Sequence, residues 1–214
     1  MKLLMTGILF LFALCCKSQQ QTVYIYDKVK RLTKTESANQ KKVFYYYDND
    51  GNRIKKLLTT PIICSGATAF FHAGTIDTAN TYQWQVNTGS GFVNINNDAI
   101  YSGTTTHSLV LNNPQTSWYG YKYHCLINGI SGQSFSNDET LKFNAIWIGT
   151  ISTAWENPAN WGCSKVPDGS TDVFINAGTP FQPIVSSNTS VRSMALAGAA
   201  SWSVVSGFEF KVLN

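Results

Sequence analysis

The chain has 214 residues, of which 43% are hydrophobic, 13% aromatic and 13% charged, and its formal net charge at pH 7 is +4. This composition excludes an intrinsically disordered chain, which would contain fewer aromatic residues and more charge. The low charge, together with many Thr, Ser, Asn, Gly and aromatic residues, predicts an all-β protein.

Residues 1–18 predict a secretory signal peptide. A short basic start leads into an apolar run from Leu3 to Cys15, and small residues at Cys16 and Ser18 predict cleavage after Ser18. The apolar run is too short to span a bilayer comfortably. Lipidation at Cys15 or Cys16 is an alternative, although the residue before such a cysteine is normally small and here it is Leu or Cys. We expect a secreted or bacterial cell-surface protein with no transmembrane segment after cleavage.

The charge of the chain changes sign near residue 60. Residues 19–59 hold nine Lys or Arg and four acidic residues, whereas residues 60–214 hold five and eight. This break predicts a boundary between two parts of the chain. A solvated basic face is the favoured interpretation of residues 19–59, and secretion argues against nucleic acid as a partner.

Residues 19–59 contain a repeat, in which YIYDKVKRL returns as YYYDNDGNRI. Each copy has alternating aromatic residues, a turn led by Asp27 or Asp48, and then Arg and an aliphatic residue. This pattern predicts a strand, a turn and a returning strand. The segment DNDGN is a polar glycine turn rather than a calcium loop, because Thr59 occupies the twelfth position. The repeat resembles the YD repeats of RHS and teneurin-type shells, which implies a short β-ribbon.

Residues 60–144 alternate in the manner of half-buried strands. The runs NTYQWQV, HSLVLNN and GYKYHCLI carry the pattern, and the turn signals NTGSG, NNDAIYSG and NNPQTS separate them. Regular short strands with such turns predict a β-sandwich. In the last run, period two places Tyr123 and Cys125 on the buried face and His124 on the outer face. Adjacent His124 and Cys125 therefore cannot easily form a catalytic dyad with each other.

The residues around Trp84 and Tyr123 resemble the immunoglobulin-like modules of bacterial surface proteins. The resemblance implies that Trp84 is the core tryptophan and Tyr123 the tyrosine corner. It also implies a disulfide from Cys125. Ala73 occupies the usual place of the partner cysteine, so we expect Cys64 to bond Cys125 instead, joining the first strand to strand F.

Residues 145–214 begin with a dense motif, W-x-G followed by S-T-x-W-x-x-x-x-N-W, V-P and D-V. It is carried by Trp147, Gly149, Ser152, Thr153, Trp155, Asn160, Trp161, Val166, Pro167, Asp172 and Val173. The motif resembles a module common in large bacterial surface and adhesin-like proteins. The alternating run SVRSMALAGAASWSVVSGFEFKV that follows indicates the first rungs of a β-solenoid, short or truncated. Cys163 is the odd cysteine, and a buried thiol is favoured over an intermolecular link.

The sequence contains no motif that carries catalysis. His72, His107 and His124 lack metal-ligand spacing, and no nucleophile elbow, phosphate loop or dinucleotide fingerprint occurs. We therefore expect no catalytic residue, no metal ligand and no cofactor. The candidate ligand-binding aromatics, which could stack on sugar rings, are Trp155, Trp161 and Trp202. Packing is the favoured interpretation of Trp147, Trp155 and Trp161, because they occupy positions of the structural motif.

The expected architecture is an immunoglobulin-like sandwich flanked by a β-ribbon and a short solenoid-like β module. The expected function is non-enzymatic adhesion or scaffolding through a cell-surface protein or glycan of unknown identity. One alternative is a carbohydrate-binding module of a larger extracellular enzyme system. Another alternative is the remnant of a YD-repeat toxin.

Overall fold

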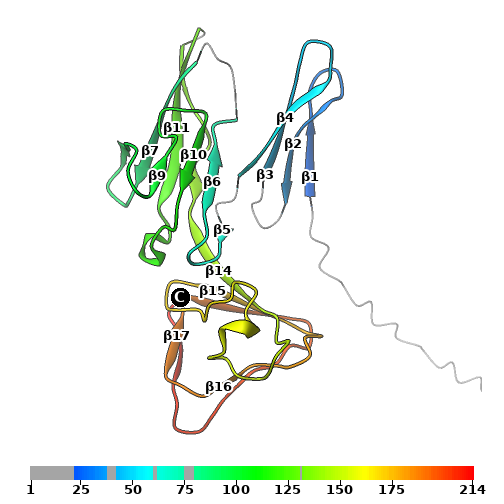
Figure 1. Ribbon diagram of the computed structural model, residues 1–214, viewed down its shortest axis with the longest axis vertical. Helices are drawn as coiled ribbons and strands as arrows, with labels where there is room; N and C mark the ends of the chain where they lie inside the picture. The colour runs from blue at the N-terminus through cyan, green and yellow to red at the C-terminus, as the bar shows by residue number, and fades with distance from the viewer. Residues whose placement is uncertain (1–21, 38–41, 60–61, 75–79, 131) are drawn as a thin grey trace, which may run out of the picture.

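The computed structural model describes residues 22–37, 42–59, 62–74, 80–130 and 132–214 (Figure 1). These ranges contain β-strands and two short 3-10 helices, and they contain no α-helix. The prediction of an all-β protein is confirmed. The predicted signal peptide and the two cysteines considered for lipidation lie outside the described residues. Within these ranges no helix has the length and apolar character that a membrane span requires.

Four antiparallel strands in sequential order form the N-terminal sheet: β1 (Thr22–Tyr26), β2 (Leu32–Ser37), β3 (Lys42–Tyr47) and β4 (Arg53–Thr59). The two repeats build two hairpins with the same turn. The Asp27 carboxylate accepts hydrogen bonds from the amides of Val29 and Arg31, and the Asp48 carboxylate accepts one from the amide of Asn52. An aspartate that bonds backbone amides beyond it closes a tight turn. The predicted strand, turn and returning strand are confirmed in both copies.

The central unit, residues 62–143, contains two sheets. One has the order β6-β10-β9, and the other has the order β12-β11-β7-β8, with β13 also paired to β11. The strands are β5 (Ile62–Ile63), β6 (Ala69–His72), β7 (Thr81–Asn87), β8 (Phe92–Asn94), β9 (Tyr101–Ser102), β10 (Ser108–Leu111), β11 (Lys122–Gly129), β12 (Gly132–Phe135) and β13 (Glu139–Thr140), with a 3-10 helix at Thr116–Trp118.

One hydrophobic core joins the two sheets of the central unit. Phe71 and Leu109 come from the first sheet, and Trp84, Tyr123 and Cys125 from the second, and all are fully buried. The Phe71 ring lies 4.9 Å from the Tyr123 ring and 6.3 Å from the Trp84 ring. Alternation along each strand turns these side chains to one face, as the sequence predicts.

The C-terminal unit, residues 144–214, is built from parallel strands (Figure 1). β14 pairs with β15 and β15 with β18, while β16 pairs with β19 and β17 with β20. The strands are β14 (Lys142–Trp147), β15 (Asp172–Asn176), β16 (Ile184–Val185), β17 (Thr189–Val191), β18 (Ser193–Ala197), β19 (Ser203–Val204) and β20 (Phe210–Val212), with a 3-10 helix at Pro158–Asn160. The pairs β16–β19 and β17–β20 form two small sheets separate from the sheet of β14, β15 and β18, and the unit has a roughly triangular outline (Figure 1).

Strand β14 connects the two cores. Leu141 and Phe143 are buried in the core of the central unit, and Ala145 and Trp147 are buried in the core of the C-terminal unit. The short strand β5 pairs in parallel with the start of β14, with Ile63 opposite Phe143. The chain therefore passes from one unit into the next along a single hydrogen-bonded strand.

Candidate functional site

The disulfide joins Cys64 to Cys163, and the predicted bond between Cys64 and Cys125 is wrong. The Cα atoms of Cys64 and Cys163 are 5.5 Å apart, and 99 positions separate them in the sequence. Cys64 directly follows β5. Because β5 pairs with β14, Cys64 lies beside the C-terminal unit. Cys125 is a buried free thiol, and burial raises its pKa to about 12. Because Cys163 is bonded to Cys64, the expectation of a free thiol at Cys163 is also wrong.

Polar contacts reinforce the junction that the disulfide closes. The Tyr119 hydroxyl donates a 2.6 Å hydrogen bond to the Asp172 carboxylate, and the Thr116 hydroxyl donates a 3.2 Å bond to Asp168. The Arg192 guanidinium lies 4.0 Å from the centre of the Tyr119 ring. Covalent, hydrogen-bonded and cation–π contacts thus hold the central and C-terminal units together.

Trp155 and Trp161 form the core of the C-terminal unit, so their candidate role as sugar-stacking aromatics is wrong. They are 0% and 1% exposed, and they meet edge to face at 4.6 Å. The Trp161 indole donates to the carbonyl of Trp155, and the Trp147 indole donates to the carbonyl of Phe181. Trp202 is half-buried beside Phe210. Of the three candidates, Trp202 alone is not fully buried, although it packs against the core of the C-terminal unit.

Asn160 is the polar centre of the same motif, a role that its motif position alone did not reveal. Its side chain is fully buried, accepts hydrogen bonds from the amides of Ile151 and Ser152, and donates to the Ser152 hydroxyl and the Ala154 carbonyl. All the hydrogen-bonding capacity of the amide group is used within the loop. The Asn-Trp pair therefore fastens the loop and fills the core.

Gly149 explains the W-x-G part of the motif. Its φ is +51°, and a Cβ atom at this position would collide with the Phe181 carbonyl and the Trp147 indole nitrogen. A side chain here would meet both strain and a clash. The motif is thus an internal structural element of the C-terminal unit.

His124 and Cys125 point to opposite faces of β11, as predicted, but the face of His124 is covered. Its ring stacks on Phe92 with a centroid distance of 3.6 Å. One ring nitrogen lies 2.8 Å from the Gln85 amide oxygen and the other lies 3.0 Å from the Asp138 carboxylate. These contacts make His124 a structural residue.

Trp84 and Tyr123 are fully buried, as predicted for core residues. The Trp84 indole donates to the carbonyl of Thr106, and the Tyr123 hydroxyl lies 3.2 Å from the Tyr101 hydroxyl. A tyrosine corner would instead bond a backbone group. Tyr123 is therefore a core tyrosine with a side-chain partner.

Charged residues meet between the N-terminal sheet and the central unit. Lys42 and Glu139 are both 8% exposed, and the Lys42 ammonium lies 2.5 Å from the Glu139 carboxylate. Burial raises the pKa of Glu139, and the ammonium of Lys42 opposes this shift. A pocket of about 280 Å³ adjoins the pair, and its walls include Lys34, Phe44 and Phe135. The ion pair is a direct contact between the N-terminal sheet and the central unit, and each charge compensates the other where both are buried.

His72 and His107 connect the same two parts. The ring nitrogens of His72 lie 2.8 Å from the Leu58 carbonyl and 2.8 Å from the Ser108 hydroxyl. Burial lowers the pKa of His72 to about 4, so this side chain is neutral at pH 7. The Lys55 ammonium lies 2.9 Å from a ring nitrogen of His107. These histidines occupy a junction between strands.

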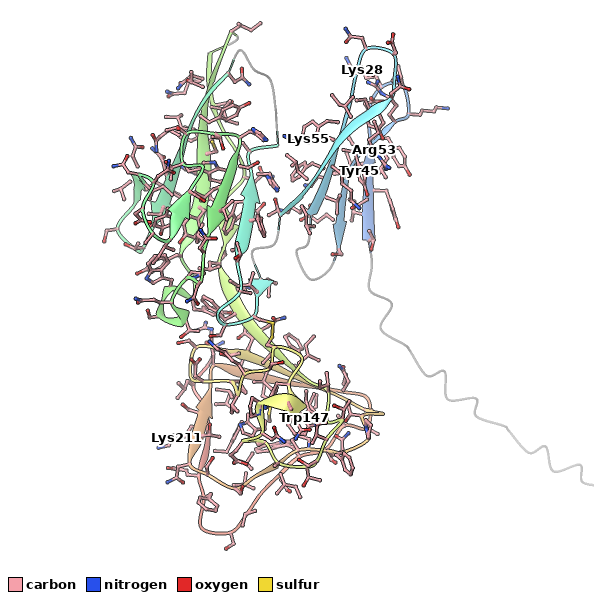
Figure 2. The ribbon with its side chains drawn as sticks, in the orientation of Figure 1. Lys28, Tyr45, Arg53, Lys55, Trp147 and Lys211 are labelled. Carbon is pink, nitrogen blue, oxygen red and sulfur yellow. A yellow bond between two sulfur atoms is a disulfide. The ribbon has the colours of Figure 1, made fainter. Side chains whose placement is uncertain are left out.

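The register of the N-terminal sheet separates two faces. Lys42, Phe44 and Tyr46 alternate along β3, and both Lys42 and Phe44 contact or line the junction with the central unit. Val43 and Tyr45 point to the opposite face. The Tyr45 ring there lies near the exposed Arg53 (Figure 2). Lys56, which is also exposed, lies 6.0 Å from the centre of the same ring.

No protein-family model matches the chain, and no curated protein matches it. Within the described ranges, no three His, Cys, Asp or Glu side chains gather in a way that could hold a metal ion. The geometry of the chain itself therefore carries the functional proposal.

Proposed function

We propose that this protein is a non-catalytic, secreted or bacterial cell-surface protein that acts in adhesion or scaffolding through protein or glycan contacts. Its parts would be a YD-like β-ribbon, an immunoglobulin-like sandwich and a short β-solenoid. The two facing sheets around Trp84 and Tyr123 support the sandwich. The stacked parallel strands of the C-terminal unit support the solenoid.

The observation that carries the proposal is the way successive units are fastened. The disulfide Cys64–Cys163 and the shared strand β14 connect the central and C-terminal units, and the Lys42–Glu139 pair connects the N-terminal sheet to the central unit. A body fixed in this way keeps exposed surfaces at constant separations, which suits a scaffold. A disulfide is also typical of proteins outside the reducing cytosol.

The use of the titratable side chains supports a non-catalytic role. His72 and His124 each contact two polar partners, and His107 contacts Lys55. The Cys125 thiol is buried, and its raised pKa disfavours the reactive thiolate. These groups stabilise the fold.

A carbohydrate-binding module is the second candidate. The exposed residues Tyr24 and Tyr26 on β1 and the partly exposed Trp202 favour it, because aromatic faces stack on sugar rings. Trp155 and Trp161 are buried and offer no ring face to a sugar.

A binding panel that also records turnover tests the proposal. The purified protein would be applied to immobilised glycans and cell-surface proteins, and the solution would be analysed for released products. We expect saturable binding to at least one of the glycans or proteins, and no released product in the solution. Release of cleaved or modified glycan would contradict the non-catalytic role, and a lack of binding to every glycan and protein would contradict adhesion.

A further inference from the structure

The N-terminal sheet presents a face that points away from the central unit. Cross-strand pairs in the register place alternate residues on this side. We call it the outer face, and its residues are Tyr24, Thr35, Val43, Tyr45, Lys56 and Leu58. Arg53, at the start of β4, lies with its guanidinium carbon 5.6 Å from the centre of the Tyr45 ring and so borders this face.

Positive charge on the outer face is not neutralised. Arg53 and Lys56 are exposed and form no ion pair with any described residue; both lie near the Tyr45 ring, Lys56 at 6.0 Å. The described part of the outer face contains no carboxylate. Lys28 and Lys30 add two exposed cations in the turn between β1 and β2.

Three of the four acidic residues of the sheet and its turns are engaged elsewhere, and the fourth, Asp50, is exposed in the turn between β3 and β4 and forms no ion pair with Arg53 or Lys56. The Asp27 carboxylate bonds the Arg31 guanidinium at 2.7 Å, and the Asp48 carboxylate bonds the amide of Asn52. Glu36 lies on the opposite face, 2.8 Å from the Lys34 ammonium. The cations of the outer face are therefore available to an external anion.

Aromatic surface accompanies this charge. Tyr24 is 57% exposed on the edge strand β1, and Tyr45 is half-buried in the middle of the sheet. Guanidinium and ammonium groups bind carboxylate and sulfate oxygens through charge-assisted hydrogen bonds, and tyrosine rings pack against the apolar faces of sugars. These groups extend across strands rather than around one pocket, which fits an extended polymer better than a small anion.

We propose that the outer face binds an acidic polysaccharide, one that carries carboxylate or sulfate groups along its chain. This inference rests on the proposed adhesive function and names the ligand class of that function. Charge complementarity supplies most of the attraction, and Tyr24 and Tyr45 supply contact with the sugar rings.

The test compares two double variants that lose the same charge. Arg53→Gln/Lys56→Gln removes both cations of the outer face, and Lys122→Gln/Lys211→Gln removes two exposed cations from the other units (Figure 2 labels Arg53 and Lys211). Binding would be measured by surface plasmon resonance to immobilised polygalacturonate and dextran sulfate, with neutral dextran and duplex DNA as further surfaces. Circular dichroism would show that both variants keep the fold.

We expect affinity for the acidic polysaccharides to fall about tenfold in the first variant and by less than about twofold in the second. Binding by the native protein should also weaken as salt is raised, since exposed charges are screened. Equal losses in the two variants, or tighter binding to DNA than to both acidic polysaccharides, would overturn the inference. Binding to neutral dextran alone would overturn it while leaving the proposed function intact. Binding to none of these surfaces would overturn it, and it would overturn the proposed function as well only if the protein also bound none of the glycans and cell-surface proteins of the first panel.

Discussion

Cys64 and Cys163 are bonded across 99 residues, and this bond fastens the segment after β5 to the C-terminal unit. A cross-link that closes so long a loop removes much conformational freedom from the unfolded chain. The double variant Cys64→Ser/Cys163→Ser should therefore lower the free energy of unfolding by about 2–5 kcal/mol. Chemical denaturation followed by tryptophan fluorescence measures this loss.

The control for this prediction is Cys125→Ala, which leaves both bonded cysteines in place. Non-reducing peptide mapping of this variant should still recover the peptide of Cys64 joined to that of Cys163. A map that joins Cys64 to Cys125 in the native protein would contradict the structure.

The thiol of Cys125 should resist alkylation in the folded protein. It is fully buried, and burial raises its pKa to about 12, so both the accessible and the ionised fractions are very small at pH 8. Mass spectrometry after iodoacetamide treatment should show no modification without denaturant and complete modification at Cys125 in denaturant. Rapid labelling of the folded chain would contradict this.

Asn160 should be among the most sensitive polar positions of the C-terminal unit. Asn160→Ala removes a fully buried side chain that bonds two backbone amides and a backbone carbonyl, so we expect a loss of about 2–4 kcal/mol in the free energy of unfolding. Asn157→Ala is the matched control, because its side chain accepts one hydrogen bond at the start of the 3-10 helix. It should cost about 0.5–1 kcal/mol. Equal losses in the two variants would contradict the role assigned to Asn160.

Acid should weaken the protein through His72. Its pKa falls from 6.5 to about 4 on folding, so between these values the unfolded state binds a proton that the folded state does not. The free energy of unfolding should therefore decrease as pH falls from about 6.5 to about 4, by about 1–3 kcal/mol after allowing for partial exposure.

The variant His72→Gln isolates this contribution from nearby Lys55, His107 and Glu139. It should be less stable than the native protein at pH 7 and should show a shallower loss of stability across the same pH range. Urea titrations at pH 7.0, 5.5 and 4.5 would measure the slope, and an unchanged slope in the variant would contradict the assignment.

Local features were predictable because they depend on neighbouring residues. The turns at Asp27 and Asp48 follow from side chains that bond amides two to four positions later. The burial of Trp84 and Tyr123 follows from period two along a strand. The prediction that Trp155 and Trp161 pack inside the C-terminal unit came from their motif positions, and their burial agrees with it.

The disulfide was not predictable because it depends on distant strands. Ile63 pairs with Phe143, and this parallel contact places Cys64 beside the C-terminal unit. No spacing along the chain indicates which strand β5 joins. The sequence likewise did not indicate which face of the N-terminal sheet points outward, because the contact of Lys42 with the distant Glu139 decides this orientation.

Size-exclusion chromatography of a fluorescent polygalacturonate with the purified protein tests the central claim most directly, since it records binding and cleavage together. We expect the polymer to elute earlier in the presence of the protein, salt to reverse this shift, and the recovered polymer to keep its original length. Shortened polymer would contradict the non-catalytic role, and an unshifted elution position at low salt would contradict binding of an acidic polysaccharide.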